Sequence, residues 1–382
     1  MIPPSSACRM WFPASLLAVV VALPSSAQDR LIVQTVGSTH LSFQAEDFHR
    51  NEGTYKSNGI DPAWEWVDVS GGGLPGGGEA DGGMAMRSSM LGPWLFHDGR
   101  LTYLVRFAQP GTYRLYMRYS FFDVQDNTNY GNEDSVVIPV DVAEFGSTPT
   151  YEYFLPGFSN DPTNGFFEGS NFVWNNSGVD YVITASDVGI THTLFMDTRE
   201  GGFTMDRIVL HLDPTLSING GSDGSDSNGE SKALDTLPES ISFGPVGQAI
   251  CSPANLNSSG AAATLTVLGS TTAKLGLLRL EARSLPPGQL GYFLVSARTA
   301  FKPFPGGSQG NLCLGSKIGR FVRQVGLSDS AGRLSIDVDT TSLPTVGLGI
   351  GAGDTWYFQT WFLDQNPTST SNFTDAVGVT FL

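Results

Sequence analysis

Oxygen-bearing side chains alternate with small or apolar residues in one short segment near the start of the chain. Gln44 and Glu46 flank Ala45 in the segment Phe43–Phe48. If this segment is a β-strand, their side chains leave it on the same face. Ca²⁺ is a hard cation that takes several ligands from carboxylates, amides and backbone carbonyls. This pair is therefore a candidate for calcium binding, the alternative being ordinary polar residues at a sheet edge.

Three tryptophans have the chemistry to bind sugar. The apolar face of a pyranose ring can lie on a flat aromatic side chain while planar polar groups bind its hydroxyls. Trp64 and Trp66 alternate in one predicted strand, and Trp174 precedes a later one. Trp174 and Trp64 are the preferred stacking candidates, whereas Trp66 is as well explained as a core residue.

The first half of the chain resembles the β-sandwich carbohydrate-binding modules of families 6 and 35. The resemblance spans about residues 41 to 213 and is carried by the segments Phe43–Phe48 and Glu200–Leu210. It implies a structural calcium ion where the first and last strands meet, and sugar binding rather than catalysis. The implied calcium ligands are Gln44, Glu46 and Asp206. The resemblance implies Asn132, Trp174 and Arg199 as sugar-binding residues, and the aromatic pattern adds Trp64 and Trp66.

Other motifs offer weaker evidence for catalysis. Gly306–Gly310 matches the nucleophile elbow of hydrolases, but the histidine base of that fold follows its serine, and the last histidine here is His211. Ser308 is therefore predicted to lie in a loop between strands and not to be a nucleophile. A glycoside hydrolase or polysaccharide lyase would instead draw two acids from the loop Asp123–Asp134, because such enzymes need paired carboxylates across a cleft.

The N-terminus predicts export. Arg9 precedes the apolar run Ala14–Leu23, and small residues at Ser25–Ala27 suit cleavage before Gln28. The run is shorter than the roughly 20 residues that span a bilayer, so a signal peptide over residues 1–27 is favoured over a membrane anchor. We expect a secreted or cell-surface protein with no membrane insertion after cleavage.

The acidic composition excludes some partners. The whole chain carries 21 basic and 37 acidic residues, a formal net charge of −16. Nucleic acid and anionic lipid both require a cationic surface, so neither is an expected partner.

The apolar pattern predicts an all-β fold with two domains. Residues 28–213 should form a β-sandwich (jelly roll), residues 214–241 a flexible acidic linker, and residues 242–382 a second, smaller β-sandwich-like domain. Leu101–Phe107 and Tyr113–Tyr119 alternate with period two around a Pro-Gly turn, which predicts a hairpin. Further strands are expected at Ser135–Val142, Tyr181–Ala185, Thr191–Asp197, Met205–Leu212, Ala263–Leu268, Leu277–Ala282, Gly291–Ser296, Leu334–Val338, Thr355–Leu363 and Ala376–Phe381.

Cys251 and Cys313 are the cysteines left after the predicted leader is removed. In an exported protein an even pair predicts a disulfide, with buried free thiols as the alternative. Closing a loop of about 60 residues would stabilise the fold by about 3 to 4 kcal/mol. Around these cysteines the C-terminal half resembles a domain found at the C-termini of exported planctomycete-type proteins, for which the resemblance implies no activity.

The sequence thus predicts an exported, non-catalytic protein that binds polysaccharide or a cell-surface glycan, with structural calcium in its first domain. Its second domain would serve attachment or assembly. The alternatives are the jelly-roll enzyme described above and a structural cell-surface protein that does not bind sugar. The sequence predicts neither the glycan nor the oligomeric state.

Overall fold

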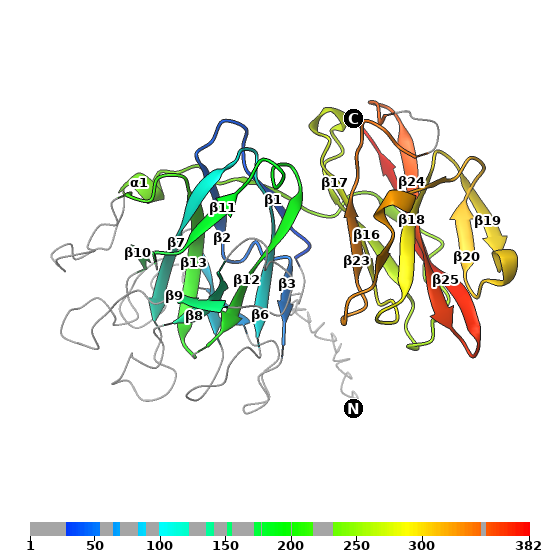
Figure 1. The fold of residues 1–382 in the computed structure, drawn as a ribbon, viewed down its shortest axis with the longest axis horizontal. Helices are drawn as coiled ribbons and strands as arrows, with labels where there is room; N and C mark the ends of the chain where they lie inside the picture. The colour runs from blue at the N-terminus through cyan, green and yellow to red at the C-terminus, as the bar shows by residue number, and fades with distance from the viewer. Residues whose placement is uncertain are drawn as a thin grey trace, which may run out of the picture.

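The protein is all-β and consists of two packed β units (Figure 1). The computed structural model describes residues 28–53, 64–68, 83–88, 99–121, 135–140, 151–154, 172–176, 178–199, 201–216, 232–344 and 349–382. The predicted signal peptide and the acidic loop Asp123–Asp134 lie outside these residues. No helix in these ranges is long and apolar enough to cross a membrane.

The N-terminal unit is a sandwich of two sheets (Figure 1). One sheet has the order β14-β1-β6-β12-β8-β9, with β3 beside β6, and the other has the order β10-β7-β13-β5-β4, with β11 beside β7 and β2 beside β13. The strands are β1 Leu31–Val33, β2 His40–Gln44, β3 Arg50–Glu52, β4 Trp64–Asp68, β5 Met84–Ser88, β6 Arg100–Arg106, β7 Gly111–Phe121, β8 Val136–Pro139, β9 Tyr151–Phe154, β10 Val173–Asn175, β11 Asp180–Ile183, β12 Thr191–Thr198, β13 Phe203–His211 and β14 Ile241–Phe243.

The predicted hairpin between β6 and β7 is wrong. Both runs are strands, but β6 pairs with β1, β3 and β12, whereas β7 pairs with β10, β11 and β13 in the opposite sheet. The chain therefore crosses from one sheet to the other at Gln109–Gly111. Alternate residues of both strands, such as Tyr103 and Leu115, are fully buried in one shared core. Period-two alternation records that burial, but it does not specify which strand supplies the hydrogen-bonding partner.

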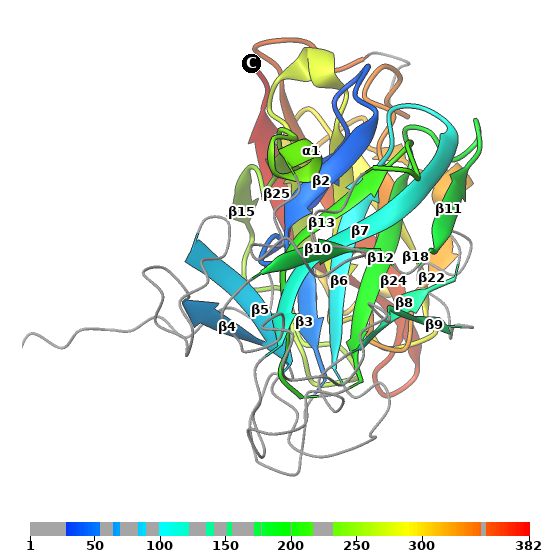
Figure 2. The ribbon, with the colours of Figure 1, turned by 90° about the vertical axis from the view of Figure 1, so that its left-hand side faces the viewer.

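The second half of the predicted linker belongs to the N-terminal sandwich. Helix α1 (Lys232–Asp235) places Leu234 in a buried cluster with Tyr116, Trp174 and Val209. Figure 2 shows α1 against the side of the sandwich that carries β2, β7 and β10. β14 then extends the β1 sheet, so the chain enters the second unit only at about residue 244. Residues 232–241, which the sequence predicted to be linker, are therefore packed structure.

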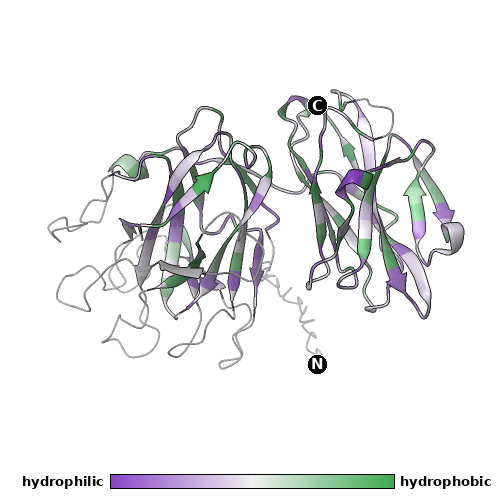
Figure 3. Cartoon of the chain, viewed as in Figure 1, coloured by the Kyte–Doolittle hydropathy of each residue, from purple (hydrophilic) through white to green (hydrophobic). Residues whose placement is uncertain are grey.

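The C-terminal unit is a second sandwich. Its larger sheet has the order β15-β25-β24-β18-β21 with β22 beside β18, its smaller sheet is β16-β17-β23, and β19 and β20 form a separate pair. Along the strands hydrophilic and hydrophobic residues alternate (Figure 3). Apolar side chains fill a main core that includes Phe293, Trp356 and Phe358, and a smaller buried cluster contains Cys313 and Phe373. The strands are β15 Gln248–Ile250, β16 Thr264–Gly269, β17 Leu278–Arg283, β18 Leu290–Ser296, β19 Thr299–Pro303, β20 Asn311–Leu314, β21 Gly319–Arg320, β22 Gly326–Leu327, β23 Leu334–Asp337, β24 Thr355–Gln365 and β25 Ser369–Thr380.

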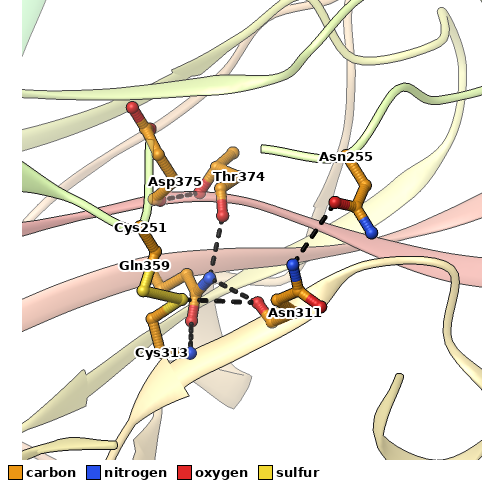
Figure 4. Close-up of a disulfide and its surroundings, with 7 residues drawn as sticks. All are labelled: Cys251, Asn255, Asn311, Cys313, Gln359, Thr374 and Asp375. Atoms are coloured by element: carbon orange, nitrogen blue, oxygen red, sulfur yellow. Dashed lines mark hydrogen bonds between the residues drawn. A yellow bond between two sulfur atoms is a disulfide. The ribbon is translucent and has the colours of Figure 1, made fainter. Parts of the chain in front are cut away.

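The predicted disulfide is present. Cys251 and Cys313 are bonded across 62 residues, with their Cα atoms 6.4 Å apart (Figure 4). The buried Gln359 amide holds β20 beside this bond, because its oxygen accepts the Cys313 N–H at 2.9 Å and its nitrogen donates to the Asn311 carbonyl at 2.9 Å. The disulfide and this amide together anchor the β19–β20 pair to the sandwich.

A buried ionic network joins the two sandwiches. Glu281 of β17 accepts hydrogen bonds from His49 Nε2 at 2.9 Å, from Arg50 Nη2 at 2.5 Å and from Arg283 Nε at 2.8 Å. Asp29 binds the same two arginines from the N-terminal side, at 2.9 and 2.6 Å. Burial alone would raise the pKa of Glu281, but His49, Arg283 and Arg50 hold it well below its usual value. Burial lowers the pKa of His49.

A second set of contacts lies beside the first. Asp337 of β23 accepts from Arg106 Nη2 at 2.9 Å, from Arg279 Nη1 at 3.2 Å and from the backbone N–H of Thr191 at 2.8 Å. An apolar cluster of Leu31, Leu104 and Leu268 crosses the same interface. The face of the β1–β6–β12 sheet therefore packs on the face of the β16–β17–β23 sheet, as Figure 1 shows.

Candidate metal centre and ligand site

The three predicted calcium ligands meet where β2 pairs with β13. Gln44 is opposite Arg207 in the antiparallel register, and the Ala45 N–H donates to the Asp206 carbonyl at 2.7 Å. Asp206 occupies the irregularity between Met205 and Arg207 in the pairing of β13 with β7. Such an extra residue re-aims its side chain relative to the regular alternation of the strand.

The electrostatics of this cluster are unusual. Asp206 is fully buried and pairs with Arg118, while the Gln44 amide nitrogen donates to Glu239 at 2.5 Å. Gln44 Oε1 and Glu46 Oε2 are buried and accept no hydrogen bond from any described residue. Burial raises the pKa of Glu46 to about 8, and the nearby carboxylates of Asp206, Asp47 and Glu239 add to the shift.

This donor set fits a hard cation. Two buried acceptors without donors, one amide and one carboxylate, have the chemistry that Ca²⁺ prefers. The ion would supply the positive charge that the group lacks, since Arg118 already pairs with Asp206. Within the described ranges, however, no group of three or more His, Cys, Asp or Glu side chains is arranged to hold a metal. Any calcium site here therefore depends on the Gln44 amide and on carbonyl oxygens as well as carboxylates.

Glu239 and Arg118 belong to this site but were not expected from the sequence. Glu239 falls in the segment predicted to be linker, and only the packing of residues 232–241 on β2 brings it beside Gln44. Arg118 lies on the solvent-facing alternation of β7 and meets Asp206 because β7 and β13 are neighbours. Neither position carries a motif, so no sequence signal could have identified them.

Two of the predicted stacking residues are buried. Trp64 is a fully buried core residue of β4. Trp174 is 2% exposed, lies on β10 rather than in a loop, and donates from Nε1 to Asp235 of α1 at 2.6 Å. The assignment of these two rings to sugar stacking is therefore wrong in this structure, because the core covers one and the α1 segment covers the other.

The remaining predicted sugar-binding residues are scattered. Trp66 is partly exposed on β4 and packs edge-on against Phe48, with ring centroids 5.8 Å apart. Arg199 donates to Ser135 at the end of β12. Asn132 lies outside the described residues. The structure thus leaves Trp66 as the predicted tryptophan with an accessible surface.

Ser308 has a structural role. It is buried in the turn before β20, donates from Oγ to the Ser371 carbonyl at 2.8 Å and accepts from the Gly310 N–H at 3.2 Å. The predicted loop between strands is present, and the hydroxyl fixes its conformation.

Comparison with known proteins does not assign the chain to a family. No protein-family model and no curated sequence matches it. Among solved structures, a β-1,2-glucanase from Parabacteroides distasonis aligns over 94% of this chain and 39% of its own, at 11% identity and a TM-score of 0.17. A tetra-tandem repeat from the extending region of a large adhesion protein aligns over 79% of this chain and 65% of its own, also at 11% identity and a TM-score of 0.17. The chain therefore spans less than two thirds of either structure, and similarity this low supports no conclusion about function.

Proposed function

We propose that the chain is an exported, non-catalytic polysaccharide-binding protein whose N-terminal sandwich is stabilised by calcium. The observation that carries this proposal is the meeting of Gln44, Glu46 and Asp206 at the β2–β13 pairing, with two buried oxygens that accept no hydrogen bond from the described residues. The same three positions are implied by the resemblance to carbohydrate-binding modules of families 6 and 35.

Calcium would act here by neutralising negative charge beside buried oxygen atoms. Its ligands would be Gln44 Oε1, Glu46 Oε2 and backbone carbonyls, with Asp206 sharing its charge between the ion and Arg118. Because β2 lies near the start of the sandwich and β13 near its end, such an ion would join segments far apart in the sequence. Its binding free energy would then add directly to the stability of the fold.

Sugar binding would use the partly exposed Trp66 in place of Trp64 and Trp174. The Trp66 ring faces Phe48 and the sandwich core, whereas the ion pair between Glu65 and Arg87, at 2.9 Å, lies on the other face of β4 and β5. The accessible part of the Trp66 ring would supply the stacking surface. The C-terminal sandwich would serve attachment or assembly.

The ionic interface favours a second candidate, a structural cell-surface protein that does not bind sugar. Removing one partner from a buried pair costs about 3 to 5 kcal/mol, so a network of several such pairs fixes the orientation of the two sandwiches. A protein that holds another molecule at a set distance from the cell surface requires such a fixed orientation of its domains.

A pull-down on insoluble polysaccharides, supported by a glycan array, separates these candidates. The protein beginning at Gln28 is tested in calcium and in chelator, and the supernatant is assayed for released sugar. Retention without release supports the proposal, and loss of retention in chelator links it to calcium. Released sugar would favour an enzyme, and absence of both would favour the structural protein.

The matched variants are Glu46→Gln and Glu65→Gln. Both remove one carboxylate from the same sandwich, but only Glu46 belongs to the buried oxygen cluster. Calcium titration by calorimetry should lose its signal in Glu46→Gln and keep it in Glu65→Gln. Equal calcium affinity in both variants would remove the proposed site.

A further inference from the structure

One stretch of this acidic protein contains basic residues but no acidic ones. Between Glu281 and Asp329 the sequence contains no acidic residue, although the whole chain has 37. Five basic residues of this stretch have exposed side chains: Arg298, Lys302, Lys317, Arg320 and Arg323. Within the described part of the chain, none of the five forms an ion pair with a carboxylate.

Four of these cations lie along one edge of the larger C-terminal sheet. The Gly315 N–H donates to the Arg298 carbonyl at 2.6 Å, which brings the segment before Lys317 beside the end of β18. Arg320 is in β21, the edge strand opposite Leu294 of β18, and Arg323 follows in the short 3₁₀ helix Val322–Gln324. The edge therefore presents a row of positive charge, defined here as the basic edge (Arg298, Lys317, Arg320 and Arg323).

The basic edge ends in a groove of about 710 Å³. Arg320, Arg323 and Gln324 line it together with apolar groups of Phe321, Val322 and Leu343. Gln324 donates from Nε2 to the Asp337 carbonyl at 2.9 Å, which ties the 3₁₀ helix to β23 and fixes one wall. The groove thus combines two arginines with an apolar surface, and the hydrogen bond of Gln324 fixes the backbone of one wall.

Two carboxylates also line the groove, and both already have partners. Asp337 binds Arg106 and Arg279. Asp339 accepts from the Thr341 N–H at 2.9 Å and from its hydroxyl at 2.6 Å. Asp337 is neutralised by two arginines, whereas the partners of Asp339 are uncharged, so the groove presents the guanidinium groups of Arg320 and Arg323 against one exposed carboxylate.

We propose that this groove and the basic edge form a binding site for an acidic polysaccharide, one that carries carboxylate or sulfate groups on its sugars. Planar guanidinium groups bind such oxyanions through two parallel hydrogen bonds, and the exposed Val322 offers apolar contact to a sugar ring. The choice of sugar polymer rests on the proposed function. The site itself is separate from the calcium cluster and does not need the cation.

The net charge of the protein argues against nucleic acid and anionic membranes. Both are extended anionic surfaces that would also meet the remaining acidic surface of a chain with net charge −16. A single polysaccharide strand lying in a groove avoids that repulsion.

The test measures binding of the whole protein from Gln28 to polygalacturonate, dextran sulfate and neutral dextran, in EGTA so that calcium cannot bridge protein and polymer. We expect binding to one or both acidic polymers, no binding to neutral dextran, and weaker binding at higher salt. Arg320→Gln and Arg323→Gln should each weaken binding about tenfold, because each removes a charge-assisted contact. Comparing the two acidic polymers distinguishes carboxylate from sulfate.

Lys274→Gln is the matched control, because Lys274 is an exposed cation of the same sandwich outside the groove. It should change affinity less than twofold. Equal losses in the control and groove variants, or tighter binding to duplex DNA or phosphatidylserine vesicles than to either polymer, would overturn the proposal. Calcium-dependent retention on polysaccharide without any binding in EGTA would reject this site and leave the proposed function intact.

Discussion

The two sandwiches connect distant parts of their chains by different means. In the C-terminal sandwich a disulfide links Cys251 to Cys313 beside the buried Gln359 amide. In the N-terminal sandwich the corresponding connection is the cluster of Gln44, Glu46 and Asp206, where buried oxygens meet. The disulfide does not titrate, whereas burial raises the pKa of the Glu46 carboxyl group to about 8. If the cluster binds calcium as proposed, the stability of the N-terminal sandwich should depend on calcium as well as on pH.

The largest expected effect comes from removing the covalent link. Replacing both cysteines by serine should lower the free energy of unfolding of the C-terminal sandwich by about 4 kcal/mol, since the unfolded chain regains the freedom of a 62-residue loop. Urea unfolding followed by fluorescence measures this loss. An unfolding midpoint equal to that of the parent protein would show that Gln359 and the core suffice to hold β20.

The second expected effect tests whether the two sandwiches unfold as one. Glu281→Ala should lower the free energy of unfolding by about 3 kcal/mol. The substitution leaves Arg50 and Arg283 at the interface with Asp29 as their remaining carboxylate partner. The calorimetric transition should split into two, one for each sandwich. Glu52→Gln is the control, because its pair with Arg333 lies nearer the surface and should contribute less than about 1 kcal/mol.

The third prediction concerns pH. The folded-state pKa of Glu46 is raised from 4.5 to about 8, so folding favours its protonated form. The contribution of protonated Glu46 to the free energy of unfolding is fully present below the pKa of Glu46 in the unfolded chain. It is lost as the pH rises through about 8. In chelator, the melting temperature should therefore fall between pH 5 and pH 9.

Added calcium should reverse that loss, and Glu46→Gln should flatten the pH profile in chelator. Glu65→Gln should leave the profile unchanged. The same pH profile in Glu46→Gln and the parent protein would assign the dependence to another group, of which Asp47 is the nearest candidate because burial also raises its pKa.

The smallest expected effect concerns Trp174. Trp174→Phe removes the hydrogen bond to Asp235 and some packing beneath α1, at a cost of about 1 kcal/mol. Polysaccharide retention should be unchanged, because the ring is buried. Reduced retention with unaltered stability would contradict the burial and restore Trp174 as a contact residue.

The sequence by itself determined the all-β class, the positions of most strands and the pairing of Cys251 with Cys313. It did so because period-two alternation indicates which side chains become buried on folding, and because two cysteines can form only one disulfide bond. It also predicted that Gln44 and Glu46 share one face of a strand, but β2 ends at Gln44 and Glu46 lies in the turn that follows.

The tertiary structure decided what lies opposite each strand. It placed β6 and β7 in different sheets, covered Trp174 with α1, brought Glu239 to Gln44 and Arg118 to Asp206, and joined the sandwiches through Glu281. Each of these contacts links residues distant in sequence. Alternation within a strand reveals that a side chain is buried, but the partner that buries it is selected only when the sheets pack.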